Sequence, residues 1–118
     1  MERDPRGFLY DARQSADAIT RFLAGISQDE YLTNEILRAA VERHFEIIGE
    51  ALARLARSSP EVAARIPDLA RAVAFRNLLI HGYRVVDSQT VWRITQEDLP
   101  PLRDGVAALL ADLESGPA

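Results

Sequence analysis

Cysteine and lysine are both absent from this chain of 118 residues, and each absence removes a class of function. Without cysteine there is no disulfide framework and no thiolate metal site, so nothing in the chain demands an oxidising compartment. The six glycines are scattered, and without lysine they cannot form the phosphate-binding loop of nucleotide-hydrolysing folds. Disulfide-stapled proteins and phosphate-loop enzymes are therefore excluded.

Long apolar runs are missing as well. The first residues, MERDPRGFLYDAR, carry charges where a signal peptide has an apolar stretch. No run approaches the roughly 20 apolar residues that span a bilayer. The composition, 47% hydrophobic and 27% charged, is typical of a folded globular chain. We expect one soluble domain, residues 1–118, located in the cytoplasm and without membrane contact.

Positive charge is scarce overall but concentrated in one segment. The formal net charge is −4, which argues against a broad cationic surface for nucleic acid. Residues 65–84 nevertheless contain four arginines and one acid, a net charge of +3, which leaves −7 for the remainder. Any contact with RNA is therefore expected to be local and to involve this segment.

Apolar residues recur at helical spacing, and no alternation typical of strands is present. This pattern predicts an all-α fold, an up-down bundle of about four to five helices. Start and stop signals come from a capping box at 27–30, from prolines and from aspartates that can cap a helix. The expected helices are 7–23, one long helix from the capping box to the break at 58–60, 60–66, 68–82, and a last stretch from Asp87 or Ser88 to Leu113 that Pro100 and Pro101 bend or interrupt.

Three single residues have both a structural and a functional interpretation. His44 lies on the apolar stripe of the second expected helix, where a histidine is usually a packed, hydrogen-bonded core residue. Trp92 is expected to anchor a core or an interface rather than to stack on a base. The role of Glu50 stays open. Gly49 beside it costs roughly 1 kcal/mol of helix propensity relative to alanine, which indicates close approach by another helix or by a ligand.

Metal and serine chemistry find no support in the residue spacing. The Glu-x-x-His pairs of di-iron bundles are absent, and Leu78 and Leu79 stand where His81 would need further ligands. No serine lies in a strand-to-helix elbow, because the strands are missing. We expect neither a metal nor a cofactor.

The segment RNLLIHGYRVVD, residues 76–87, is the richest in reactive side chains. Arg76, Asn77, His81 and Tyr83 place a fixed cation, an amide, an imidazole and a phenol within eight residues. Metal-free RNA cleavage needs a base for the 2'-hydroxyl proton, an acid for the leaving 5'-oxygen and positive charge on the phosphorane between them. Histidine serves in either proton transfer at neutral pH, and arginine supplies charge through paired hydrogen bonds. The segment therefore predicts a metal-free ribonuclease site with Arg76 and His81 as catalytic residues.

Helix geometry constrains this site. At about 100° per residue, Tyr83 lies nearly over Arg76, whereas His81 points about 140° away from it. Either the helix unwinds near Gly82, or two copies of the segment face each other across a dimer, which we favour. The structural alternative is that Arg76 pairs with an acid, His81 satisfies carbonyls at the helix end and Tyr83 packs beneath the last helix.

The string Arg76-Asn77-x-x-x-His81-x-Tyr83 resembles the signature of HEPN-domain proteins, and the whole chain resembles the HepT toxin branch of that superfamily. The likeness extends over about residues 8–113 and includes the blocks AVERHFEIIGEAL, RNLLIHGYRVVD and VWRITQEDLPPL in that order. The resemblance implies a helical bundle whose homodimer forms a shared cleft. There Arg76 and His81 of both subunits would cleave an RNA such as tRNA or mRNA without metal, and Asn77 would orient them.

The resemblance also implies a regulatory partner. Such toxins are encoded beside a small nucleotidyltransferase antitoxin of the MNT type, which attaches AMP to the motif tyrosine, by position Tyr83. The adduct would fill the cleft and repel substrate phosphate. Two other interpretations stay open: a noncatalytic subunit that holds nucleotide or substrate for a nucleotidyltransferase, and a purely structural helical dimer.

Overall fold

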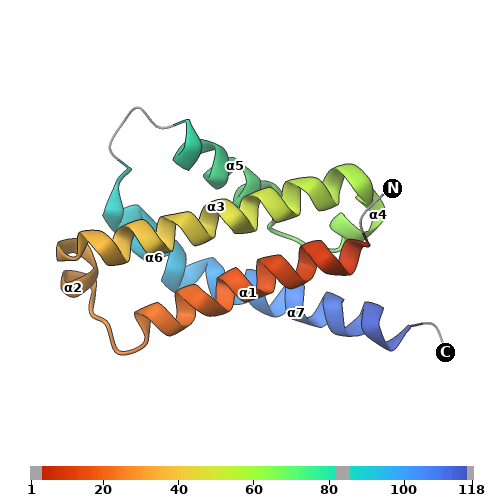
Figure 1. The fold of residues 1–118 in the computed structure, drawn as a ribbon, viewed down its shortest axis with the longest axis horizontal. Helices are drawn as coiled ribbons and strands as arrows, with labels where there is room; N and C mark the ends of the chain where they lie inside the picture. The colour runs from red at the N-terminus through yellow and green to blue at the C-terminus, as the bar shows by residue number, and fades with distance from the viewer. Residues whose placement is uncertain (1–3, 82–85, 117–118) are drawn as a thin grey trace.

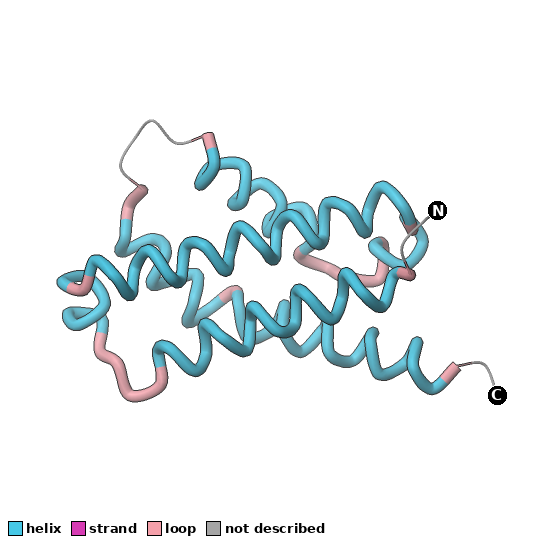
Figure 2. The backbone as a smooth tube through the Cα atoms, in the orientation of Figure 1, coloured by secondary structure: helices cyan, strands magenta, loops and turns pink. Residues whose placement is uncertain are grey.

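The computed structural model describes residues 4–81 and 86–116, and within these ranges the chain is helical without strands (Figures 1 and 2). The prediction of an all-α fold is confirmed. The described residues form seven helices, whereas the sequence predicted about four to five. They are α1 (Pro5–Leu23), α2 (Gln28–Thr33), α3 (Glu35–Ser58), α4 (Pro60–Ala63), α5 (Leu69–Ile80), α6 (Ser88–Glu97) and α7 (Leu99–Ser115).

One extra helix results from a break that the sequence analysis missed. The predicted capping box is present, since Ser27 Oγ accepts from the Glu30 amide and the Glu30 carboxylate accepts from the Ser27 amide. The helix that starts there ends at Thr33, because Asn34 leaves the helical conformation and its Oδ1 accepts from the Leu37 amide. The prediction of one uninterrupted helix was therefore wrong: the asparagine caps a new helix.

The second break falls where the proline pair predicts an interruption. Asp98 ends α6, and α7 begins at Leu99, so Pro100 and Pro101 occupy the first turn of α7. Amides of a first turn have no partner within the helix, and proline is therefore tolerated there. The interruption is confirmed.

The remaining boundaries differ by a few residues. α1 begins at Pro5 rather than at 7, because the Asp4 carboxylate accepts from the Arg6 amide and caps it. α4 ends at Ala63 instead of 66. Asp68 precedes α5 as expected, but its side chain makes no capping hydrogen bond. Asp87 caps α6 through the amide of Gln89.

Helix α3 forms the centre of the fold. The long helices α1, α3, α5 and α7 alternate in direction, and α5 lies on the opposite side of α3 from α1 and α7 (Figure 1). The core is formed mainly where α1, α3 and α7 meet, with α6 and the fully buried ring of Tyr31 from α2 at one end. Trp92 packs its ring 5.5 Å from that of Tyr31, in keeping with its predicted anchoring role.

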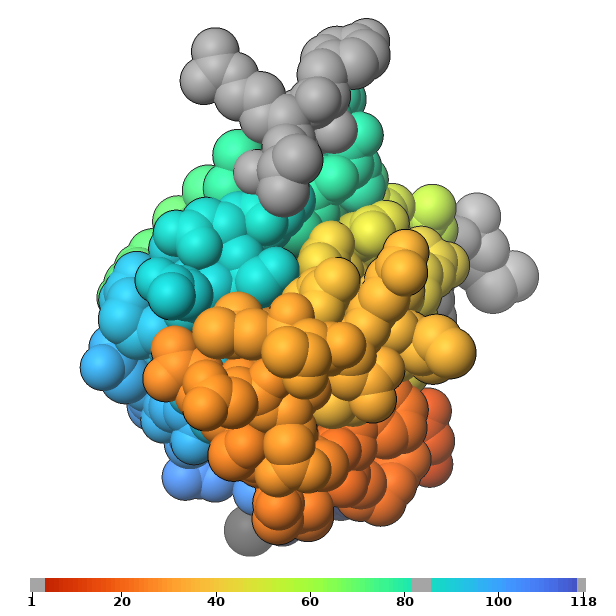
Figure 3. All heavy atoms as spheres, turned by 90° about the vertical axis from the view of Figure 1, so that its left-hand side faces the viewer, coloured from red at the N-terminus to blue at the C-terminus, as the bar shows by residue number. Residues whose placement is uncertain are grey.

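Helix α5 is bound to the rest of the molecule on one side. None of its residues is buried, and its main partner is α3, where the Phe75 ring meets Phe45 edge to face at 5.1 Å. Leu78 and Ile80 keep 60% and 41% of their surface exposed. The space-filling view shows α5 at the top of the molecule, above α3 and α6 (Figure 3). Among the described helices, none has the length and apolar character to cross a membrane.

Candidate active site

The reactive motif lies at the C-terminal end of α5. Arg76 and Asn77 lie in the last turns, and His81 is the capping residue, whose backbone amide donates to the Asn77 carbonyl at 3.1 Å. The helix stays regular through Ile80, so Arg76 and His81 of one chain project about 140° apart. The side chain of His81 is exposed. Tyr83, the predicted modification residue, lies outside the described residues, as does the expected helix end at Gly82.

Gly49 on α3 packs directly against the side chain of Arg76. A methyl group on Gly49 would overlap the Cβ of Arg76, lie 2.8 Å from its Cγ and lie 3.1 Å from the Ala72 carbonyl oxygen. Only a residue without a side chain lets the two helices approach so closely. The prediction that another helix approaches Gly49 is confirmed, and the approaching residue is the motif arginine itself.

Glu50 joins two arginines from different helices. Its Oε2 lies 2.6 Å from Nη2 of Arg76, while its Oε1 accepts from Nε of Arg54 at 2.7 Å. On the other side, Nη1 of Arg76 donates to Oδ1 of Asn77 at 2.9 Å. The Arg76 guanidinium is thus held at both terminal nitrogens, by Glu50 from α3 and by Asn77 from its own helix.

The electrostatics keep Glu50 charged. The hydrogen bond from Arg54 lowers the pKa of the Glu50 carboxyl; burial opposes this, and the positive charges of Arg76, Arg54 and Arg57 lower the pKa further. Two guanidinium groups therefore contact the Glu50 carboxylate, and a third, that of Arg57, adds its positive charge. These contacts give Glu50 a structural role, which the sequence had left open.

The structural alternative considered for Arg76 is met in part, because Arg76 does pair with an acid. The ring of His81, in contrast, has no hydrogen bond to any described residue, and the helix-end bond is made by its backbone amide. The sequence analysis missed Arg54, although its spacing of four residues from Glu50 is the one that allows an ion pair on a helix.

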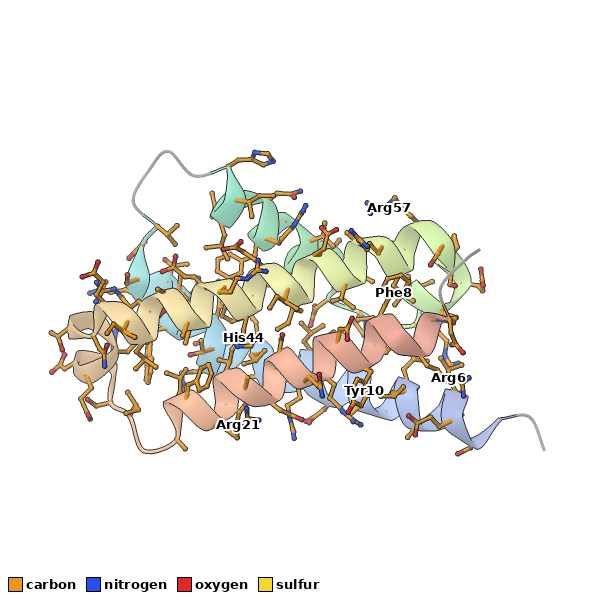
Figure 4. The ribbon with its side chains drawn as sticks, viewed as in Figure 1. Arg6, Phe8, Tyr10, Arg21, His44 and Arg57 are labelled. Atoms are coloured by element: carbon orange, nitrogen blue, oxygen red, sulfur yellow. The ribbon has the colours of Figure 1, made fainter. Side chains whose placement is uncertain are left out.

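His44 belongs to a separate region. It borders a groove of about 610 Å3 between α1 and α3, whose lining includes neither Arg76 nor His81. Its Nδ1 lies 3.0 Å from Oγ of buried Ser15, and burial lowers its pKa, as do the charges of Arg21 and Arg43. Figure 4 shows His44 between α3 and α1. The predicted hydrogen bond of His44 is confirmed, but its ring is half-buried at the edge of the groove and does not belong to the core.

No three His, Asp or Glu side chains gather anywhere in residues 4–81 and 86–116 in a way that could hold a metal ion. The groups available at the motif are an imidazole, an amide, guanidinium groups and one carboxylate. These can transfer a proton and bind an anion.

Comparison with known proteins identifies the family. Residues 12–109 match the family model described as Ribonuclease HepT-like, and the chain belongs to this family of the HEPN superfamily. A protein of Methanocaldococcus jannaschii, named "Putative RNase MJ1380", is 36% identical over 105 residues, which cover 89% of this chain and 95% of the relative. "Probable ribonuclease HepT" of Thermococcus cleftensis is 31% identical over 105 residues, covering 87% and 93%. No solved structure matches the chain.

Proposed function

We propose that this chain is a metal-independent endoribonuclease whose active site forms between two copies, and that it is the toxin of a toxin–antitoxin pair. Membership of the HepT-like ribonuclease family supports RNA cleavage. The observation that carries the site is the end of α5, where Arg76 is held in place from two sides and His81 is exposed. In this proposal Arg76 and His81 are catalytic and Asn77 supports Arg76.

The need for a second copy follows from the geometry of α5. Arg76 and His81 of one chain diverge by about 140°, so one phosphate cannot readily contact both. Between them on the sequence lie Leu78 and Ile80, which are large, apolar and well exposed. Burying such surface is favourable by roughly 25 cal/mol per Å2. A twofold contact of α5 with the partner's α5 would cover these side chains and bring each His81 towards the partner's Arg76.

The reaction needs two proton transfers at one phosphate. The base removes the proton of the 2'-hydroxyl, whose oxygen attacks phosphorus, and the bond to the 5'-oxygen breaks as the acid protonates it. The products are a 2',3'-cyclic phosphate and a 5'-hydroxyl. His81 and the partner's His81 supply the base and the acid, and Arg76 stabilises the extra negative charge of the phosphorane.

Silencing by a partner completes the proposal. A nucleotidyltransferase antitoxin of the MNT type would attach AMP to Tyr83, two residues beyond His81 in the sequence. The added phosphate carries negative charge and bulk into the cleft and repels the phosphates of RNA.

Induction of this chain alone in a bacterium tests the proposal. We expect growth arrest with new RNA fragments that end in cyclic phosphate. Arg76→Ala should reduce cleavage by about 100-fold or more, since loss of one charge-stabilising donor typically costs 100- to 1000-fold. His81→Ala should lower it by about 100- to 10,000-fold. Arg93→Ala, an exposed arginine paired only within α6, is the matched control and should keep full activity.

Activity that persists in purified His81→Ala protein would disprove the proposed site. Normal growth and intact RNA from a folded wild-type chain would instead favour the noncatalytic interpretation, in which the chain holds nucleotide or substrate for a nucleotidyltransferase. Nucleotide binding would then be measured directly. A chain that binds neither RNA nor nucleotide would be a structural dimer.

A further inference from the structure

Gly49 and Glu50, which are adjacent on α3, together fix the position of the Arg76 side chain. Gly49 lets the backbone of α5 come so close that Arg76 Cβ occupies the space of a missing methyl group. Glu50, the next residue, then reaches the far end of the same side chain, 2.6 Å from Nη2. Gly49 thus determines where the Cβ of Arg76 lies, and Glu50 determines where its guanidinium group lies. Arg76 is correspondingly the less exposed partner, with 25% of its side chain accessible.

Glu50 is itself held in place. Arg54 donates to its second oxygen, so both carboxylate oxygens have an arginine partner. Arg57 lies within electrostatic reach of the same carboxyl. Residues 50, 54 and 57 fall within about 60° of one another on a helix and extend over roughly 10 Å. Figure 4 shows Arg57 on the side of α3 that faces away from α1.

The charge of the cluster exceeds what its acid can neutralise. Arg54, Arg57, Arg76 and Glu50 together carry a net charge of +2 in a chain whose net charge is −4. The acids Asp11 and Glu46 lie in the pocket beside Glu50 and Arg54, where Arg43 adds a further positive charge. A guanidinium carries five N–H donors, and Arg54 is seen to use one of them, Nε, on Glu50. Its side chain is 57% exposed. Donors thus remain for a phosphate beside the one that Arg76 would bind.

We infer that Glu50 is the positioning residue of Arg76, and that Arg54 and Arg57 form a second subsite, which binds the RNA backbone phosphates next to the scissile one. The inference rests on the proposed function and deepens it, because it extends the site from α5 onto α3. Glu50 does not touch the reacting atoms. It fixes the direction in which Arg76 presents its free donors.

The effect of Glu50→Gln on purified protein separates positioning from structure. Loss of the ion pair frees Arg76, and kcat should fall about 10- to 100-fold, since a misplacement of roughly 1 Å costs about 100-fold. KM should stay equal or fall, because a negative charge next to substrate phosphate is removed. A fall in kcat without any rise in KM is not what general damage to the fold produces. Glu50→Asp, one methylene shorter, should be only partly active.

The matched control is Glu46→Gln. Glu46 lies one turn earlier on α3, beside the same pocket, and pairs with Arg43 at 3.6 Å rather than with Arg76. It should leave both kcat and KM unchanged. Urea unfolding monitors the folded fraction of each variant. A Glu50→Gln enzyme with wild-type kcat would overturn the positioning role, whereas a wild-type protein that cleaves no RNA would refute the proposed function instead.

RNA binding tests the second subsite without any need for cleavage. Fluorescence anisotropy with a single-stranded RNA, in the His81→Ala background, gives affinity as a function of salt. Each lost phosphate contact should lower the slope of log K against log salt by about 0.7. Arg54→Gln with Arg57→Gln should therefore reduce it by about 1.4, while the control Arg93→Gln on α6 leaves it unchanged. An unchanged slope in the double variant overturns the subsite.

Discussion

Helices α3 and α5 pack against each other, yet they are integrated into the molecule very differently. α3 buries seven residues and contacts α1 on one side and α5 on the other. α5 buries none, and its apolar Leu78 and Ile80 face outwards. Helix α3 therefore determines whether the chain folds. Helix α5 carries the motif on a surface that, in the proposed function, becomes complete only after association with a second copy.

This contrast separates stability from activity. A residue in the α1–α3–α7 core should change the free energy of unfolding and leave the rate of each folded molecule intact. A residue at the α3–α5 contact should change both, and a residue on the outer face of α5 should change activity through assembly alone. The four variants below test this order, from the largest expected effect on unfolding to the smallest.

Leu52→Ala tests the core side of the comparison. Leu52 is completely buried in α3. Removing its isobutyl group should lower the free energy of unfolding by about 2–5 kcal/mol, through lost burial and the cavity left behind. Urea unfolding followed by circular dichroism, at one fixed protein concentration, measures the change. Cleavage per folded molecule should be that of the wild type, and a large fall in this rate would mean that core and site are coupled.

Gly49→Ala tests the contact between the helices. The added methyl group overlaps Arg76 Cβ, so α5 has to shift. Overpacking costs about 1–3 kcal/mol, and the better helix propensity of alanine returns about 1 kcal/mol. We expect a net loss of 0 to about 2 kcal/mol in the free energy of unfolding and a fall in kcat of about 10- to 100-fold.

Gly105→Ala on α7 is the control for this change. A methyl group there meets nothing within 4 Å, so the substitution should stabilise the chain by up to about 1 kcal/mol and leave cleavage unchanged. If Gly49→Ala behaves in the same way as Gly105→Ala, the close approach of Arg76 is unimportant for activity.

Leu78→Asp tests the outer face of α5. Because 60% of Leu78 is exposed in the single chain, the substitution should change the free energy of unfolding of that chain by less than about 0.5 kcal/mol. A buried, unpaired carboxylate at a twofold contact would instead oppose assembly. Sedimentation velocity should show dissociation, with loss of cleavage. Ile36→Asp, which is 83% exposed at the start of α3, serves as control. Dissociation by both variants, or by neither, would argue against a specific contact through α5.

Much of the fold could be predicted because its signals are local. The capping box at Ser27, the cap at Asp87 and the proline pair each act through the backbone of their own turn. Asn34 carried a signal of the same kind and was overlooked, since the helix with the apolar stripe from Leu37 was taken to begin at the capping box. Asparagine is as good a helix cap as serine, so the break was in principle predictable.

The site was predictable only in its parts. Arg76 and His81 stand out by their chemistry, and Gly49 indicates that something comes close. That the approaching side chain is Arg76, and that Glu50 holds its charge, depends on how α5 lies across α3. This is a tertiary contact between residues 26 positions apart, and no local spacing encodes it. The helical pairing of Glu50 with Arg54 was the one local clue.

His44→Gln should produce the smallest effect, one that depends on pH. Burial, together with the charges of Arg21 and Arg43, lowers the pKa of His44 in the folded chain below the value of about 6.5 that it has when unfolded. Between these two values the unfolded chain binds more protons. The contribution of neutral His44 to the free energy of unfolding is therefore complete above about pH 6.5. It is lost as the pH falls towards the pKa of His44 in the folded chain.

The difference in unfolding free energy between wild type and His44→Gln, measured in urea from pH 7.5 to pH 5, isolates this effect from the titration of the carboxyl groups. The wild type should lose more stability than the variant over this range. Cleavage at pH 7.5 should be equal in both, because His44 faces Ser15 and α1 and not the motif. Equal pH slopes would show that the groove opens readily enough for the charged imidazole to be solvated, and a slower variant would connect the α1–α3 side of the molecule to a site that lies on the other side of α3.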